Sequence, residues 1–108
     1  MRVLGGSGNG KRPFAILELD NVLAVRGEVG RTSAAELRRR LKELEATYPT
    51  VVVDLAAVTH MKSDGFAALL GAGRSFQRRG GRLVLRHTAP HIRRMLEVTE
   101  MLPLFRME

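Results

Sequence analysis

Three consecutive valines limit most strongly what this chain can fold into. Val51, Val52 and Val53 are followed by Asp54 and Leu55, and the run shows no alternation of apolar and polar residues. β-Branched residues favour strands, and a strand without alternation is typical of a sheet that helices cover on both faces. The run therefore predicts a buried strand of an α/β fold.

The chain before the valines predicts a hairpin and a helix. Two runs of strand-forming residues, 14–19 and 22–25, flank an Asp-Asn pair with the composition of a two-residue hairpin turn. Ser33 and Glu36 match a capping box, in which each side chain satisfies a free backbone N–H of the other residue. The helix that starts there ends near Pro49, and its predicted inward residues are Ala34, Leu37, Leu41 and Leu44.

The chain after the valines predicts a second helix, from Phe66 to Phe76. Gly80-Gly81 ends this helix. Gly71 and Gly73 lie inside it, where glycine is unfavourable, and they indicate close approach of the helix to the sheet.

A further strand and a third helix follow. Residues 83–85 form the strand. Pro90 stands at the first position of the third helix, whose predicted inward residues are Ile92, Met95 and Leu96. Leu104-Phe105 has the composition of a short final strand.

These elements follow the order ββαβαβα, with a short strand at the end. Strands separated by single helices indicate right-handed crossovers and parallel pairs, to which the hairpin adds an antiparallel one. With 108 residues, the chain has room for one domain. We therefore predict a single α/β domain over residues 13–108, with a mixed central sheet, after a flexible glycine-rich tail over residues 1–12.

The formal net charge of +7 comes mainly from arginines. Their runs, at residues 38–40, 78–79 and 93–94, fall on predicted solvent-facing sides or C-terminal ends of helices, where cations are favourable. The chain has no Trp and one Tyr, so an aromatic platform for nucleic-acid bases is not expected. Solvated helix faces are the preferred interpretation, and an acidic partner or a nucleic acid is the alternative.

The sequence offers no recognisable catalytic or metal-binding pattern. It has no cysteine, and Pro90 places a helix start between His87 and His91, so that they do not form a metal pair on one helix face. No serine lies in a nucleophile elbow, and the carboxylates of Glu18, Asp54 and others are scattered over different elements. We therefore expect neither an enzyme nor a bound cofactor or metal. No apolar run is long enough for a membrane span, and the expected location is the cytoplasm.

The segment from Met61 to Phe66 contains the most informative residues. It joins the valine-rich strand to the second helix, and the side chain of Ser63 or Asp64 can accept hydrogen bonds from the first free N–H groups of that helix. The same helix end favours an anion through its dipole. On composition alone, simple capping explains these residues at least as well as a functional role does.

Residues 51–70, VVVDLAAVTHMKSDGFAALL, resemble the core signature of the STAS domain family of anti-sigma factor antagonists. In that family a strand ending in Asp-Leu precedes a loop of the form Asp-Ser-Ser-Gly-Leu and then a helix. Residues 27–37, the stretch GGRLVL at 80–85 and residues 93–105 are similar to further family segments. The resemblance covers the chain from about residue 14 to its C-terminus.

The resemblance implies a regulator that binds an anti-sigma factor with serine kinase activity, which phosphorylates a serine at the start of the second helix. This chain has Asp64 at the corresponding position, after Ser63 and Lys62, and Gly30 where an earlier family loop tends to carry Asp. Either Asp64 supplies a fixed negative charge or Ser63 has become the phosphate acceptor. The implied partner-binding loop contains Gly30, Lys62, Gly65 and Phe66.

Two other functions stay open beside this one. STAS domains also serve as subunits of signalling and lipid-transport complexes, and the high positive charge leaves a nucleic-acid-binding domain as a weaker alternative. The resemblance decides neither the partner nor the direction of regulation, and a homodimer remains open.

Overall fold

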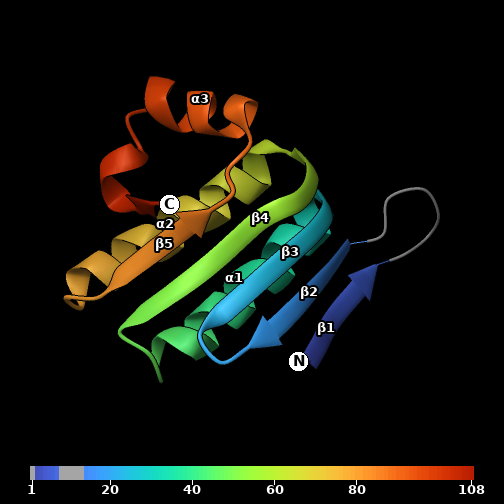
Figure 1. Ribbon diagram of the computed structural model, residues 1–108, viewed down its shortest axis with the longest axis horizontal. Coiled ribbons are helices and arrows are strands. Elements are labelled where there is room, and N and C mark those ends of the chain that lie inside the picture. The colour runs from blue at the N-terminus through green and yellow to red at the C-terminus, as the bar shows by residue number, and fades with distance from the viewer. Residues whose placement is uncertain (1, 8–13) are drawn as a thin grey trace.

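The computed structural model describes residues 2–7 and 14–108, and its centre is one six-stranded sheet (Figure 1). The strands lie in sequence order. Neighbours pair antiparallel between β1, β2 and β3 and parallel from β3 to β6, as the predicted mixed sheet requires. The strand bounds are β1 Arg2–Ser7, β2 Phe14–Leu19, β3 Val22–Val29, β4 Thr50–Met61, β5 Arg82–Arg86 and β6 Arg106–Met107.

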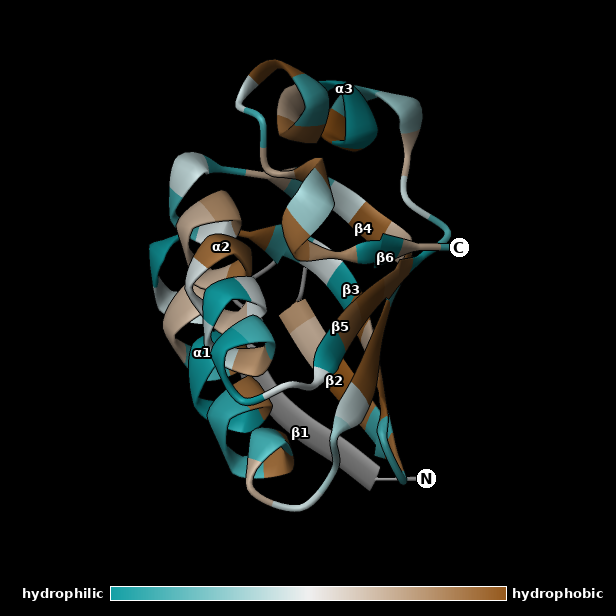
Figure 2. Ribbon diagram, turned by 90° about the vertical axis from the view of Figure 1, so that its left-hand side faces the viewer, coloured by the Kyte–Doolittle hydropathy of each residue, from teal (hydrophilic) through white to brown (hydrophobic). Residues whose placement is uncertain are grey.

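Two long helices cover one face of this sheet (Figure 2). They are α1, Arg31–Glu45, and α2, Ser63–Arg78, and they pack side by side. The shorter α3, Pro90–Val98, lies beyond one end of the sheet, and a 3₁₀ turn, Leu102–Leu104, leads from it into β6. Within the described residues no helix covers the opposite face of the sheet, which corrects the prediction that the valine-rich strand is sandwiched between helices.

The valine-rich strand is nevertheless buried. Val51 and Val53 point to the helices and are fully buried in the main core, together with Leu55. Val52 points to the uncovered face and is 8% exposed, because Val22 of β3 and Val84 of β5 flank it in register. The valines on the two neighbouring strands thus bury Val52, whereas the sequence pattern suggested that a second layer of helices would cover it.

The N-terminal segment differs from the expected tail. Residues 2–7 form β1, which pairs with β2 at the edge of the sheet and shifts register between Leu4 and Gly6. Backbone hydrogen bonds carry this pairing, so a segment whose composition is typical of a tail can still form an edge strand. Met1 and residues 8–12 of the predicted tail lie outside the described residues.

The helix ends follow the predictions only in part. Helix α1 begins at Arg31 after the N-cap Gly30, and Ser33 is its third residue, not its N-cap. The Gly30 N–H donates to the Ser33 hydroxyl at 2.7 Å, so Ser33 acts from inside the helix. Pro90 opens α3 as predicted.

The final strand begins one residue beyond the predicted pair. Leu104 is in the 3₁₀ turn, and β6 follows at Arg106. Pro103 cannot donate a backbone hydrogen bond to a ladder, so the chain completes a turn before it pairs with β5.

The predicted inward faces of the helices are mostly confirmed. Ile92 and Leu96 of α3 are buried. Met95, also predicted to point inward, is 43% exposed. The buried stripe of this short helix is narrow and consists of Ile92 and Leu96, one turn apart. The four predicted residues of α1 are all buried, namely Ala34, Leu37, Leu41 and Leu44.

Arg40 corrects the interpretation of the first arginine run. It is buried, and its guanidinium forms ion pairs with Glu18 of β2 and with Glu43 one turn further along α1. The hydrogen bond with Glu18 raises the pKa of Arg40, although burial opposes this shift. One member of the run therefore anchors α1 to the hairpin, while Arg39 is exposed beside Glu36.

The two glycines inside α2 have different surroundings. A Cβ atom on Gly73 would lie 2.8 Å from Cε1 of Phe105, whereas a Cβ atom on Gly71 would meet nothing within 4 Å. The close approach inferred from the sequence therefore exists at Gly73, and it is made to the segment before β6 and not to the sheet.

This difference makes Gly71 a matched control for Gly73. We expect Gly73→Ala to lower the free energy of unfolding by about 1–3 kcal/mol, because Phe105 must move. We expect Gly71→Ala to raise it by about 0.5–1 kcal/mol, since alanine favours the helix. Urea denaturation measures both, and a Gly73→Ala protein as stable as the parent would contradict the close contact.

Candidate functional site

The predicted site lies where β3 and β4 both end. These parallel strands run side by side to Val29 and Met61, which are register partners. Lys62 N–H then donates to the Val29 carbonyl oxygen at 2.9 Å. Since α1 follows β3 and α2 follows β4, the N-termini of both helices open at this end of the sheet, and Gly30 comes next to Lys62 in space.

Only one residue separates β4 from α2. Lys62 is the N-cap and makes no side-chain capping bond, and α2 begins at Ser63. Neither Ser63 nor Asp64 is therefore the N-cap that the sequence suggested, because β4 continues to Met61 and leaves no loop for a capping residue. Both side chains lie exposed in the first helical turn, where a negative charge is favourable.

Gly65 fixes how closely this turn approaches the sheet. It is buried, and a Cβ atom there would lie 2.8 Å from Cγ of Met61 and 2.9 Å from Cγ1 of Val29. The first turn of α2 thus rests on the ends of β3 and β4 with no space for a side chain. Phe66, the next residue, is half-buried and packs against the core while keeping part of its surface accessible.

Gly30 completes the site from the α1 side. A Cβ atom on Gly30 would make an ordinary contact, 3.6 Å from Cδ of Lys62. Its φ of −113° is accessible to any residue. The buried Ser33 hydroxyl ties this loop down by accepting from Gly30 N–H, with the Glu28 carbonyl oxygen 3.1 Å away as its own acceptor.

A salt bridge spans the same end of the sheet. Nζ of Lys62 lies 3.5 Å from Oε1 of Glu28, and the two side chains are 56% and 32% exposed. Such an exposed pair contributes little to stability. It does hold Lys62, which stands where the family pattern has Asp, over the end of β3.

The structure thus brings together all six residues singled out from the sequence. Ser63, Asp64, Lys62 and the half-buried Phe66 present side chains at one surface. Gly65 makes a close backbone contact beneath it, and Gly30 lies beside Lys62 at an ordinary contact distance. That this surface binds a partner stays a prediction.

An Asp–His pair that the sequence did not indicate lies at the carboxyl end of β5. Oδ1 of Asp54 is 3.1 Å from Nδ1 of His87 and also accepts from Ala56 N–H at 3.0 Å. Burial raises the pKa of Asp54, but the two hydrogen bonds together with the charges of His87 and Arg86 outweigh burial and lower the pKa below its ordinary value. The residues are 33 positions apart, so that only the parallel pairing of β4 with β5 brings them together.

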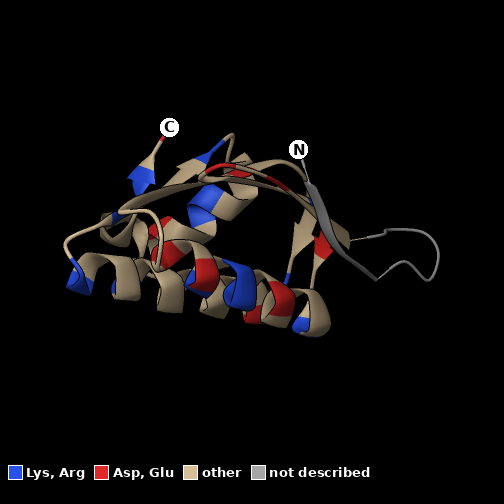
Figure 3. Ribbon diagram, turned by 90° about the horizontal axis from the view of Figure 1, so that it is seen from below, with Lys and Arg blue, Asp and Glu red and all other residues tan. Residues whose placement is uncertain are grey.

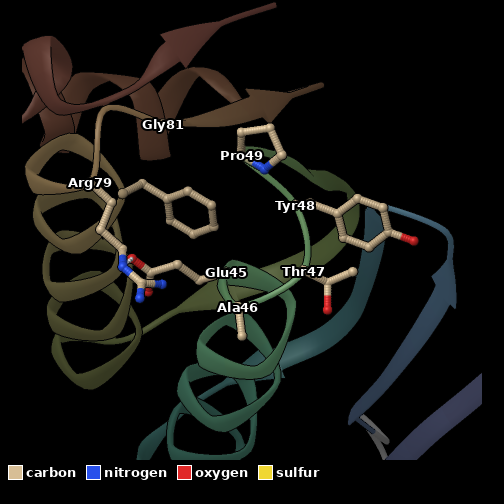
Figure 4. Close-up of a pocket in the computed structure, with 8 residues that line it drawn as sticks. Glu45, Ala46, Thr47, Tyr48, Pro49, Arg79 and Gly81 are labelled. Atoms are coloured by element: carbon tan, nitrogen blue, oxygen red, sulfur yellow. Dashed lines mark ion pairs between the residues drawn. The ribbon is translucent and has the colours of Figure 1, made fainter.

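A cleft lies at the opposite end of the two long helices, and its polar side chains have a structural role (Figure 4). It has a volume of about 310 Å³ and lies between the end of α1, the turn to β4 and the end of α2. The Ser75 hydroxyl donates to the carboxylate of Glu45, and Arg79 approaches the same group at 4.0 Å. These polar contacts join α1 to α2. Within residues 2–7 and 14–108, no cluster of His, Asp and Glu side chains could hold a metal ion.

Residues 15–103 match the family model described as "Mlab, STAS domain". The chain belongs to the STAS domain family. Comparison with curated proteins finds no match. Among the described residues, no helix is long and apolar enough to cross a membrane.

Solved structures share the fold at low sequence identity. An anti-sigma factor antagonist from Mycobacterium paratuberculosis is 22% identical, with a TM-score of 0.72 over 94% of this chain and 88% of that one. The anti-sigma factor antagonist SpoIIAA in its unphosphorylated form is 18% identical, with a TM-score of 0.68 over 88% and 86%. The Bacillus cell fate determinant SpoIIAA in its phosphorylated form is also 18% identical, with a TM-score of 0.67 over 88% and 90%. The chain is a divergent STAS domain with the fold of these antagonists.

The two site glycines allow the first turn of α2 to be tested. We expect Gly65→Ala to lower the free energy of unfolding by about 1–3 kcal/mol, because Met61 and Val29 leave no space for a methyl group. Gly30→Ala is the matched control, with an expected change below about 0.5 kcal/mol. Chemical denaturation compares them, and equal effects would argue against the close contact at Gly65.

The Asp54 pair predicts a pH-dependent contribution to stability. A carboxylate whose pKa is lowered by folding stabilises the protein above its unfolded pKa of about 3.9, and this contribution is lost as the pH falls through the lower, folded pKa. Asp54→Asn should therefore cost about 1 kcal/mol at pH 7, and the difference from the parent should shrink below about pH 4. Thermal unfolding at pH 7 and pH 3 measures it; an unchanged difference at pH 3 would rule out the ionised carboxylate as its source.

Proposed function

We propose that this STAS domain is a protein-binding regulator, not an enzyme, and that it binds its partner through the first turn of α2. The observation that carries the proposal is the exposure of Ser63 and Asp64 in a turn held against the sheet by Gly65. A turn in this position presents a hydroxyl and a carboxylate at a defined height above the strand ends. A partner surface can recognise both groups without any movement of the backbone.

The partner that best fits the resemblance is an anti-sigma factor of the serine kinase type. Asp64 occupies the position where the family's phosphorylated serine stands, and it supplies a permanent negative charge in the first helical turn. Binding then proceeds without the usual phosphorylation. The competing hypothesis is that Ser63, one residue earlier and equally exposed, accepts the phosphate.

The alternative partner is a component of a larger complex. The description of the matching family model, "Mlab, STAS domain", names no anti-sigma factor, so a STAS subunit of a signalling or lipid-transport complex is the second candidate. Such a subunit would contact an ABC ATPase in place of the anti-sigma kinase. Both partners would be proteins, so both are compatible with the same surface of α2.

The test is binding of the purified domain to each candidate ATPase encoded in the source genome, measured by titration calorimetry. We expect one of them to bind, and Ser63→Glu to weaken that binding at least about tenfold, since a new charge enters the interface. Gln77→Glu is the matched control, because it places the same charge on an exposed position near the other end of α2. Equal affinities of both variants would contradict the proposed surface.

Intact-mass measurement after incubation with the cognate kinase and ATP separates the two hypotheses on phosphorylation. No added phosphoryl group on the parent supports the fixed charge at Asp64. A single added phosphoryl group that is absent from Ser63→Ala would overturn it in favour of Ser63.

A further inference from the structure

The face of the sheet away from α1 and α2, here called the open face, carries four arginines that are scattered in the sequence. They are Arg26 of β3, Arg82 and Arg86 of β5, and Arg106 of β6. The register places them on this face. Arg106 is the register partner of Val84, Arg82 and Arg86 stand two residues from Val84, and Arg26 stands two residues from Ala24. Val84 and Ala24 both point away from the buried core. Figure 3 shows the basic colour on β6, beside the C-terminus, with the two long helices below the sheet.

Three of these arginines have no salt bridge to another described residue. They are Arg26, Arg82 and Arg106, and all three are exposed. Arg86 is partly neutralised by Glu108, at 3.2 Å. The acidic side chain in the centre of the face is Asp54, which lies between Ala24 and Arg86 in register and is paired with His87. The open face is therefore basic, chiefly over β5 and β6.

An apolar strip adjoins this basic region on the same face. Val22, Val52 and Val84 are register partners across three strands, with Leu19 beside Val22 on β2 and Arg106 beside Val84 on β6. The row from Leu19 to Arg106 crosses five neighbouring strands, so it is roughly 19 Å long. Leu19 lies at the end of the strip that is farthest from Arg106. Its side chain is 49% exposed, although β2 is an interior strand of the sheet.

A small hollow of about 170 Å³ lies beside this row. Its lining includes Leu17, Ala24, Ala56 and Ala57, with Arg26 and Asp54 also at its wall. The small side chains leave room there for an aliphatic side chain from outside. The open face thus offers an apolar anchor point next to Arg26, which forms no salt bridge with a described carboxylate.

We propose that the open face is a second interaction surface, which binds an acidic protein segment carrying aliphatic side chains. A second copy of this chain is disfavoured, because two open faces would bring their arginines together. A nucleic acid is disfavoured, since the described residues of this face include no aromatic side chain for base stacking. Carboxylates matched to the arginines and an aliphatic group over the hollow satisfy both parts of the face.

The test uses a fluorescent 16-residue helical peptide with leucine at helical spacing and glutamate elsewhere. We expect it to bind the full chain, and the double variant Arg82→Glu/Arg106→Glu to weaken binding about tenfold or more. Leu19→Asn should also weaken it. The matched control is Arg38→Glu/Arg78→Glu, which changes the net charge equally at exposed positions on α1 and α2 and should leave the affinity within about twofold.

Three other ligands test what the open face recognises. A peptide with lysine in place of glutamate should not bind. Equal loss of binding in both double variants would reduce the effect to overall charge and overturn the proposal. Tighter binding of a 16-nucleotide single strand or of phosphatidylglycerol vesicles, lost in the open-face variant, would assign the face to that ligand and overturn it too.

This surface is separate from the proposed partner site on α2. Ser63→Glu should leave peptide binding unchanged, and the open-face variant should leave ATPase binding unchanged. Failure of either proposal is therefore visible without failure of the other.

Discussion

The parallel pairing of β4 with both of its neighbours is the constraint on which the rest of this structure depends. Thr50–Met61 is the longest described strand, and it pairs with β3 on one side and β5 on the other. Its buried residues Val51, Val53 and Leu55 form the floor on which both long helices pack. Because parallel neighbours need crossover connections, this pairing also requires α1 and α2 to start at the same end of the sheet.

The candidate site lies at the end of the sheet where both helices start. The helices α1 and α2 open beside one another after Val29 and Met61, and the missing side chain of Gly65 lets α2 rest directly on both strand ends. Exposed groups in its first turn therefore have a rigid backbone beneath them. Among the described residues, this end of the sheet contains no metal-binding cluster.

The sequence predicted the core elements well because their signals are local. The hairpin at 14–25, the apolar stripe of α1 and Pro90 at the start of α3 all depend on neighbours a few residues away. The predictions were wrong where a distant segment decides. Ser33 could not be recognised as an internal helix residue without Gly30 and Glu28 folded over it, and Arg40 became buried because Glu18 of another element faces it.

The sequence by itself determined the α/β class, the order of the elements from β2 onward and the resemblance to STAS domains, because periodicity and turn composition depend on consecutive residues. Only the tertiary structure decided that one sheet face is bare, that Asp54 meets His87, and that four dispersed arginines share that face. These properties depend on strand register and on which side of the sheet the crossovers pass. Neither is encoded in a spacing of residues along the chain, because both arise from pairings between segments tens of residues apart.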